Sequence, residues 1–161
     1  MATTRDPRRE TPAVREARDV HVNVLLLANR SLDRLEDICR AEGLTHSQYV
    51  ALWTLCLAED PDAGIPVRAV ADGLLNRASD TTRLIDRLER AGLAERLPNP
   101  SDRRGVLVRA TADGRRRFAA VTPEIQAFHA SQWDALDPAE LDQLDALLKK
   151  ALWSGDEAPP P

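Results

Sequence analysis

The 161-residue chain carries a formal net charge of −4 and is long enough for one domain with a substantial hydrophobic core. Aromatic residues make up only 4% of the chain and helix formers are abundant, so a mainly helical fold is expected. The chain has no long apolar run, no apolar segment near its N-terminus and only two cysteines, which argues against a membrane or disulfide-rich secreted protein and favours a cytoplasmic location.

The N-terminal part is expected to form a disordered arm, residues 1–13, followed by one long helix, residues 14–43. The arm has no apolar periodicity, whereas the helix has apolar residues at helical spacing and Gly43 as a stop. The apolar face of this helix is wide for its length, which favours contacts on more than one side, as in a dimer. Its members are Val20, Val24, Leu25, Leu27, Ser31, Leu32, Leu35, Ile38 and Cys39.

Two shorter helices are expected next. Thr45 and Gln48 stand three residues apart ahead of an apolar run, which is the pattern of a capping box. A turn over residues 59–64 separates this helix from another that is expected to begin at Pro66 and to run to about Leu75. The first of the two is expected to bury Tyr49, Leu52, Trp53, Cys56 and Leu57, and the second Val67, Val70, Ala71 and Leu74.

A basic helix is expected between Ser79, as N-cap, and Gly92, as stop. Its apolar stripe is Leu84, Ile85, Leu88 and Ala91. Thr82, Arg83 and Arg87 fall largely outside this stripe. Because a short connection joins this helix to the preceding one, the pair is interpreted as a helix-turn-helix.

Two short apolar runs, residues 93–97 and 106–109, flank a segment rich in proline and arginine, which predicts a hairpin with a basic tip. A basic helix followed by such a hairpin suits duplex DNA, because a helix enters the major groove and a tip arginine enters the minor groove. Residues 77–117 hold eleven arginines against six carboxylates, while residues 132–161 hold seven carboxylates and two lysines. The alternative is a solvated charged helix beside a surface hairpin.

Two further helices are expected at the C-terminal end, residues 115–153, before a disordered tail, residues 154–161. Pro123 lies within the first and is expected to kink or interrupt it. Asp137 and Glu140 form a second capping box ahead of the last helix. Their apolar faces comprise Phe118, Val121, Ile125 and Phe128 in the first, and Leu141, Leu144, Leu147, Leu148 and Leu152 in the second. The terminal helices cannot bury such faces within one lobe, so packing against a second copy is expected.

The order of these elements, and several short motifs within them, resemble the MarR family of winged-helix transcriptional regulators over residues 20–153. The motifs are the segment from Thr82 to Glu89, Gly92 with Leu93, Asp102-Arg103-Arg104, and Thr111 with Gly114. Each is weak alone, and their common spacing makes the signal strong. Asp80 departs from the family pattern, where small hydroxyl residues are commoner, and Ala110 replaces the usual leucine.

The resemblance implies a mainly α fold with a small β-hairpin wing. One domain, residues 14–153, would contain a winged helix-turn-helix lobe, residues 45–114, and dimerisation helices, residues 14–43 and 115–153. It also implies a homodimer on pseudo-palindromic double-stranded DNA, with Arg104 in the minor groove and Asp102 bracing the wing. The expected DNA-contacting residues are Ser79, Asp80, Thr81, Thr82, Arg83, Arg87, Arg103 and Arg104.

Members of the family commonly bind small anionic aromatic ligands, so a repressor released by such an effector is expected. Arginines near the start of the first helix could pair a carboxylate, although solvated charges at a helix end are the simpler interpretation. The candidate effector residues are Arg15, Arg18, His21, Asn29 and Arg30. His46 and Trp53 could line the same crevice, but core packing is the simpler interpretation of Trp53.

Two alternatives remain open at this point. Cys39 or Cys56 could act as a redox sensor in a regulator of the same fold, although both fall on or near apolar faces. The lobe could instead bind protein rather than DNA. An enzyme is not expected, because the chain has no phosphate loop, zinc-protease motif or catalytic triad with local support. No cofactor or metal is expected either, since the three histidines have no chelating spacing.

Overall fold

The computed structural model describes residues 11–74, 81–101 and 105–153. Its elements, in chain order, are α1 (Pro12–Ala41), α2 (His46–Cys56), β1 (Ile65–Pro66), α3 (Val67–Asp72), α4 (Thr81–Arg90), β2 (Ala94–Pro98), β3 (Val106–Ala110), α5 (Ala112–Ser131) and α6 (Pro138–Leu152). The mainly helical fold with a small β-hairpin is thereby confirmed. Over the described ranges, no helix combines the length and the apolar character needed to span a bilayer.

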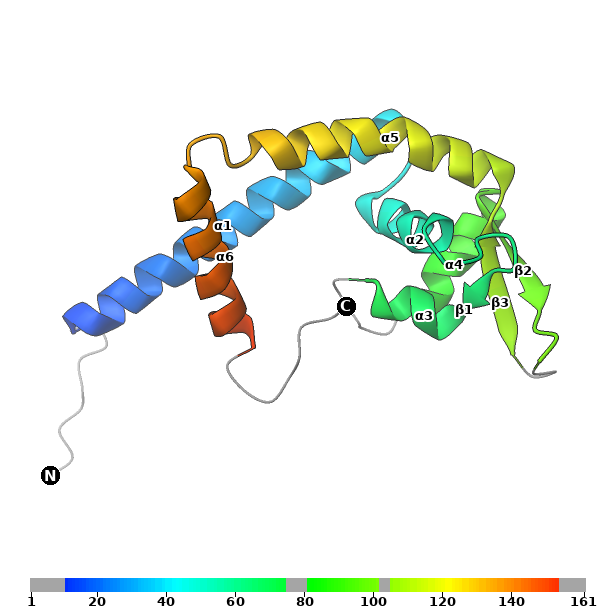
Figure 1. The fold of residues 1–161 in the computed structure, drawn as a ribbon, viewed down its shortest axis with the longest axis horizontal. Coiled ribbons are helices and arrows are strands. Elements are labelled where there is room, and N and C mark those ends of the chain that lie inside the picture. Colours follow the sequence, from blue (N-terminus) through cyan, green and yellow to red (C-terminus); the bar gives the residue numbers. More distant parts are fainter. Residues whose placement is uncertain (1–10, 75–80, 102–104, 154–161) are drawn as a thin grey trace, which may run out of the picture.

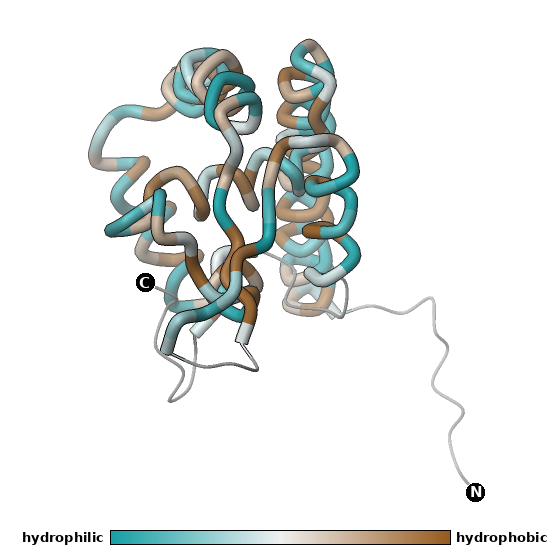
Figure 2. The backbone as a smooth tube through the Cα atoms, turned by 90° about the vertical axis from the view of Figure 1, so that its right-hand side faces the viewer, coloured by the Kyte–Doolittle hydropathy of each residue, from teal (hydrophilic) through white to brown (hydrophobic). Residues whose placement is uncertain are grey.

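The elements are arranged as a lobe and a set of longer helices. The lobe consists of α2, α3, α4 and an antiparallel sheet with strand order β1-β3-β2. In Figure 1 the lobe lies on the right, while α1 and α5 run side by side above it and α1 continues away from it to the left. Figure 2 shows hydrophobic and hydrophilic residues alternating along the helices, as expected of amphipathic elements.

The hydrophobic core lies inside the lobe and where α1 and α5 cross it. Fully buried side chains come from α2, α3, α4, the turn after α4 and the sheet, and α1 and α5 also contribute. The largest are Cys39, Leu52, Leu55, Val70, Ile85, Leu88, Leu93, Val108 and Val121. No residue of α6 is buried, so the core holds the lobe together and leaves α6 and most of α1 uncovered.

Several local predictions are confirmed by hydrogen bonds. The Thr45 hydroxyl accepts from the Gln48 amide at 3.2 Å, and the Gln48 side chain accepts from the Thr45 amide at 2.9 Å. Asp137 and Glu140 form the second capping box in the same way. Gly43 and Gly92 follow α1 and α4 with φ angles of 69° and 70°, the left-handed conformation in which glycine ends helices without strain.

The buried face of α2 differs from the prediction. Trp53 and Leu57 are 47% and 60% exposed, whereas Ala51 and Leu55 are fully buried. The run is apolar on all sides, so its period did not identify the inward face, and the contacts with the lobe decided it. The interpretation of Trp53 and Leu57 as core residues was wrong.

Three element boundaries also differ. The helix α1 begins at Pro12, with the Thr11 hydroxyl accepting from the Val14 amide, so residues 12 and 13, which were expected in the arm, belong to the helix. Pro66 pairs with Leu107 in the two-residue strand β1 rather than opening a helix, and α3 ends at Asp72. A strand this short carries no periodic signal in a sequence.

Pro123 does not interrupt α5, contrary to one of the two expectations for it. The helix is continuous from Ala112 to Ser131. Pro123 lies on the exposed side, where water can reach the carbonyl that its missing N–H leaves unpaired. The Thr122 hydroxyl donates to the Phe118 carbonyl at 2.7 Å and supports the same turn.

Candidate nucleic-acid interface

The helix α4 has one face in the core and one face in solvent. Leu84, Ile85 and Leu88 are buried against the lobe, and this apolar spacing fixes the rotation of the helix about its axis. We call Thr82, Arg83 and Arg87 the outer face of α4, because all three are exposed. A hydroxyl and two guanidinium groups on an exposed helical face supply donors that fit phosphates and the acceptors of guanine.

Some predicted contact residues can be placed and others cannot. Thr81 begins α4 and is half-buried. Ser79 and Asp80 lie outside the described residues, as do the predicted wing residues, which are Asp102, Arg103 and Arg104.

The hairpin of β2 and β3 is well defined on both sides of the wing segment. Its register runs from the pair Ala94 and Ala110 to the pair Pro98 and Val106. Beyond the strands, the Asn99 amide donates to the Gly105 carbonyl at 3.3 Å. The two strands therefore extend the hairpin away from the lobe, which Figure 1 shows at the lower right.

Not all arginines of the basic segment are available to DNA. Arg96 pairs with carboxylates of α4, Arg109 with Glu95, and Arg115 with Asp62. Arg116 and Arg117 pair with the carboxylate of Asp113 on their own helix. The eleven arginines counted in the sequence therefore overstate the positive charge of this surface, because several of them hold the structure together.

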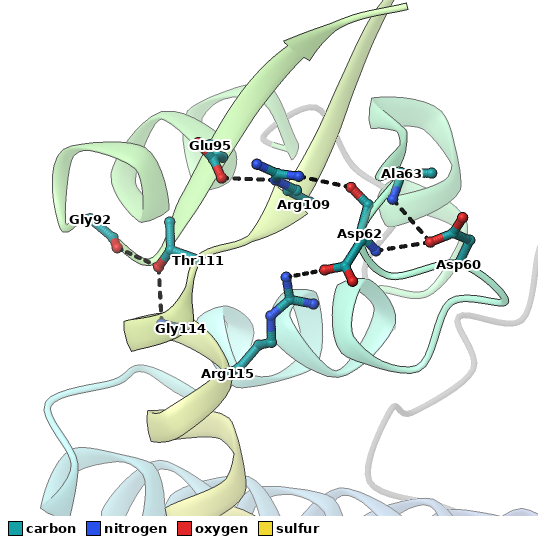
Figure 3. A network of polar contacts seen from close by, with 9 residues as sticks. All are labelled: Asp60, Asp62, Ala63, Gly92, Glu95, Arg109, Thr111, Gly114 and Arg115. Carbon is teal, nitrogen blue, oxygen red and sulfur yellow. Dashed lines mark hydrogen bonds and ion pairs between the residues drawn. The ribbon is translucent and has the colours of Figure 1, made fainter.

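A network of polar contacts joins the lobe to the start of α5 (Figure 3). Arg109 donates from Nε to Glu95 Oε1 at 2.8 Å and from Nη1 to the Asp62 carbonyl at 3.0 Å. Arg115 on α5 donates to Asp62 Oδ1 at 2.7 Å. The loop before β1, the strand pair and α5 are thus connected through one aspartate, Asp62, which no sequence pattern had identified.

Thr111 and Gly114, matched above to the family pattern, form the centre of the same junction. The Thr111 hydroxyl donates to the Gly92 carbonyl at 2.7 Å and accepts from the Gly114 amide at 3.1 Å. One side chain therefore caps α5 and ties it to the turn after α4. Gly114 is buried against the backbone of Leu93, where only glycine fits.

The predicted effector residues lie apart from the lobe. All five are exposed positions on the first two thirds of α1, from Arg15 to Arg30. At 1.5 Å per residue, His21 is about 30 Å from the end of α1 that meets the lobe. His46 and Trp53 lie on α2, so one copy of the chain does not bring the two groups together.

The pKa values of both thiols are raised, whereas a redox-sensing cysteine needs a lowered pKa. Burial raises the pKa of Cys39 to about 11, and the nearby Glu36 carboxylate adds to the increase. Burial also raises the pKa of Cys56, although Arg115 opposes the shift.

Burial lowers the pKa of His46, as does His129, against an opposing effect of Glu36. Among the described residues no group of three or more His, Cys, Asp or Glu could hold a metal ion.

We therefore expect slow alkylation of both cysteines in the native protein. At pH 8 a thiol with a pKa near 11 is about a hundredfold less ionised than an ordinary cysteine, and only the thiolate reacts. Iodoacetamide labelling followed by mass spectrometry should show Cys39 modified only after denaturant is added. Rapid labelling of Cys39 at pH 8 without denaturant would contradict the buried, protonated state.

Comparison with known proteins agrees with this geometry. The model of the MarR family matches residues 42–105, which include α2, α3, α4 and β2. The HTH-type transcriptional regulator PecS of Dickeya dadantii is 33% identical over 128 residues, which span 78% of this chain and 73% of PecS. The chain belongs to the MarR family.

Two further likenesses cover most of this MarR-family chain. The transcriptional repressor MprA of Escherichia coli K12 is 29% identical over 133 residues, or 83% of this chain and 72% of MprA. A solved structure of a mutant E. coli MarR complexed with operator DNA superposes with a TM-score of 0.74 at 28% identity, covering 85% of this chain and 96% of that one. This MarR-family protein is thus a DNA-binding transcriptional regulator and not an enzyme.

Proposed function

We propose that the protein is a homodimeric repressor that binds a pseudo-palindromic operator through two lobes and is released by a small anionic aromatic molecule. The observation that carries the DNA-binding part is the outer face of α4, whose hydroxyl and guanidinium groups are exposed while the opposite face is locked into the core. The similarity to MprA, a repressor, and to a MarR bound to operator DNA supports operator DNA as the partner and repression as the direction of regulation.

Exposed apolar surface on α1 and α6 supports the homodimer. Large apolar side chains that face solvent in one copy are concentrated on these two helices, and burying such area stabilises association by about 25 cal/mol per Å². They are Val14, Val20, Val22, Val24, Leu25, Leu26, Leu27, Leu32, Leu141, Leu147 and Leu152. In the proposed dimer these helices pack against their equivalents, which places two lobes at a fixed separation.

That separation is the proposed basis of both recognition and control. Two recognition helices that enter successive major grooves must lie about 34 Å apart. Phosphate contacts from arginines supply most of the affinity, and a few base contacts in each lobe supply discrimination of about 1–3 kcal/mol apiece. An effector that changes the angle between the lobes and the long helices lowers DNA affinity without touching the DNA-facing residues.

The wing contact is tested by Arg104→Ala. We expect operator binding to fall by at least about tenfold, the effect of removing one good minor-groove or phosphate contact, while the mass of the protein in solution stays unchanged. Arg40→Ala is the matched control, because it removes the same charge from an exposed position on α1, where Arg40 pairs with Asp37. Gel-shift titrations in which both variants bind like the unmodified protein would refute the wing contact.

The effector is tested on the natural operator. The protein is first footprinted on the DNA upstream of its own gene, and aromatic acids are then screened for release of the footprinted fragment. We propose that guanidinium groups of Arg15, Arg18 or Arg30 contribute to binding the acid, with His21 and Asn29 beside them. An effector that releases the Arg18→Ala and Arg30→Ala variants as efficiently as the unmodified protein would remove these residues from the site.

A further inference from the structure

We propose that Arg96 is a positioning residue for DNA recognition, which holds the wing hairpin at a fixed angle to α4 by binding Asp86 and Glu89. We call these three residues the clamp. This inference rests on the proposed function, because it assumes that α4 and the wing touch the same operator. It assigns a role to two carboxylates that otherwise lie beside the DNA-facing surface of α4 without explanation.

The clamp joins the two DNA-binding elements directly. From β2, Arg96 donates one Nη2 hydrogen bond to Asp86 Oδ1 at 2.6 Å and a second, from Nη1, to Glu89 Oε2. Asp86 and Glu89 are three residues apart, so they lie on the same side of α4, adjacent to the outer face. A planar guanidinium group that spans two carboxylates restricts both the distance and the angle between helix and strand.

Arg96 lies near the outer end of the contact between the hairpin and α4. Side chains alternate along β2, so Arg96 shares a face with Ala94, which is buried. Arg96 is opposite Val108, which is fully buried, whereas the next outward pair on this face, Pro98 and Val106, is exposed. Among the described residues, Arg96 is therefore the outermost point at which an ion pair ties the hairpin to α4.

A purely stabilising role explains the clamp poorly. The Arg96 side chain is 28% exposed, and its partners are 42% and 41% exposed. Ion pairs with this much solvent access contribute little to stability, because water screens them. Carboxylates near a DNA surface also repel phosphates, which the neighbouring guanidinium group offsets. Orientation of the wing relative to α4 is the function that makes use of this arrangement.

The clamp and simple electrostatics predict opposite changes in operator affinity for one variant. The double variant Asp86→Asn with Glu89→Gln removes two negative charges beside the DNA face and leaves Arg96 in place. Electrostatics alone predicts tighter binding, and so does a direct contact of Arg96 with phosphate. The clamp predicts that specific operator binding weakens by about tenfold or more, because the wing no longer reaches its groove when α4 is docked. Asp72→Asn, on α3, is the control, since this exposed carboxylate has no ion pair among the described residues.

A double-mutant cycle provides the second readout. Arg104→Ala is measured in the unmodified protein and in the Asp86→Asn, Glu89→Gln background. The clamp predicts that Arg104→Ala loses most of its effect in that background, because a misplaced wing has no contact left to lose. Arg96→Lys should give intermediate affinity, since one ammonium group cannot span both carboxylates.

Each outcome of these two experiments either supports or overturns the clamp. Equal or tighter binding by the double variant overturns the clamp, and so does weaker binding with an unchanged effect of Arg104→Ala. Circular dichroism identifies a variant that fails to fold, in which case Asp86→Asn alone, which leaves Glu89 on Arg96, replaces the double variant in the same cycle. If Arg104→Ala has no effect in the unmodified protein, the wing contact of the proposed function fails, and the sign of the double-variant effect still tests the clamp.

Discussion

Gly114→Ala is expected to destabilise the protein more than any other change from glycine to alanine in the described residues. A Cβ at this position would overlap the Leu93 carbonyl oxygen and would lie 3.1 Å from Leu52 Cδ2. The oxygen belongs to the backbone and accepts a hydrogen bond from the Thr111 amide at 3.0 Å, so it cannot move aside alone. The start of α5 and the turn after α4 must separate, at a cost above about 2 kcal/mol.

Chemical denaturation followed by circular dichroism measures this loss of free energy. Gly73→Ala is the control, because there the atoms nearest to the new Cβ all belong to the side chain of Thr54 and none to the backbone. Rotation of Thr54 relieves that contact and costs mainly its hydrogen bond to the Val50 carbonyl. A Gly114→Ala variant as stable as Gly73→Ala would show that the junction between the lobe and α5 is not packed as described.

Charging the exposed apolar faces of α1 and α6 is expected to produce a monomer without operator affinity. Leu25 and Leu147 are 49% and 56% exposed in one copy, so replacing both with glutamate costs the isolated chain little. In the proposed dimer each glutamate would be buried without a partner, which costs several kcal/mol per site. Two lobes that are no longer joined lose the gain from simultaneous binding, about a hundredfold or more.

Analytical ultracentrifugation gives the mass of the Leu25→Glu, Leu147→Glu variant, and gel-shift titration gives its affinity. Ser47→Glu, which adds a carboxylate at an exposed position in the first turn of α2, is the control and should remain dimeric. If the double variant sediments like the unmodified protein, these faces do not form the dimer interface. If it is monomeric and still binds the operator at full affinity, dimerisation is irrelevant to recognition.

Local signals predicted most elements of the fold correctly. Capping residues, glycine stops and the apolar stripe of α4 identified helices and the hairpin because each depends on neighbours within one turn. These local signals failed where tertiary contacts determine which residues are buried or paired. The inward face of α2 was misassigned at Trp53 and Leu57, because a run apolar on all sides fits several rotations. The strand β1 was missed because two residues form it only in the presence of β3.

In the candidate site, too, local features were predicted and contacts between distant residues were not. The outer face of α4 was predicted from residues that fall off the apolar stripe, and the structure places all three members in solvent. The clamp and the contacts of Asp62 were not predicted, because their partners are seven or more residues apart in the sequence and lie on different elements. A local count of charges treats every arginine alike, and only the three-dimensional pairing shows which ones neutralise carboxylates.

Selection of binding sites from a random library of double-stranded DNA tests the central claim most directly. The purified protein is incubated with the library at low ionic strength, and bound duplexes are amplified and sequenced over several rounds. A paired reader of duplex DNA predicts one enriched inverted repeat, with half-site centres about 10 base pairs apart. Enrichment of a single unrepeated half-site, or of no sequence, would contradict it.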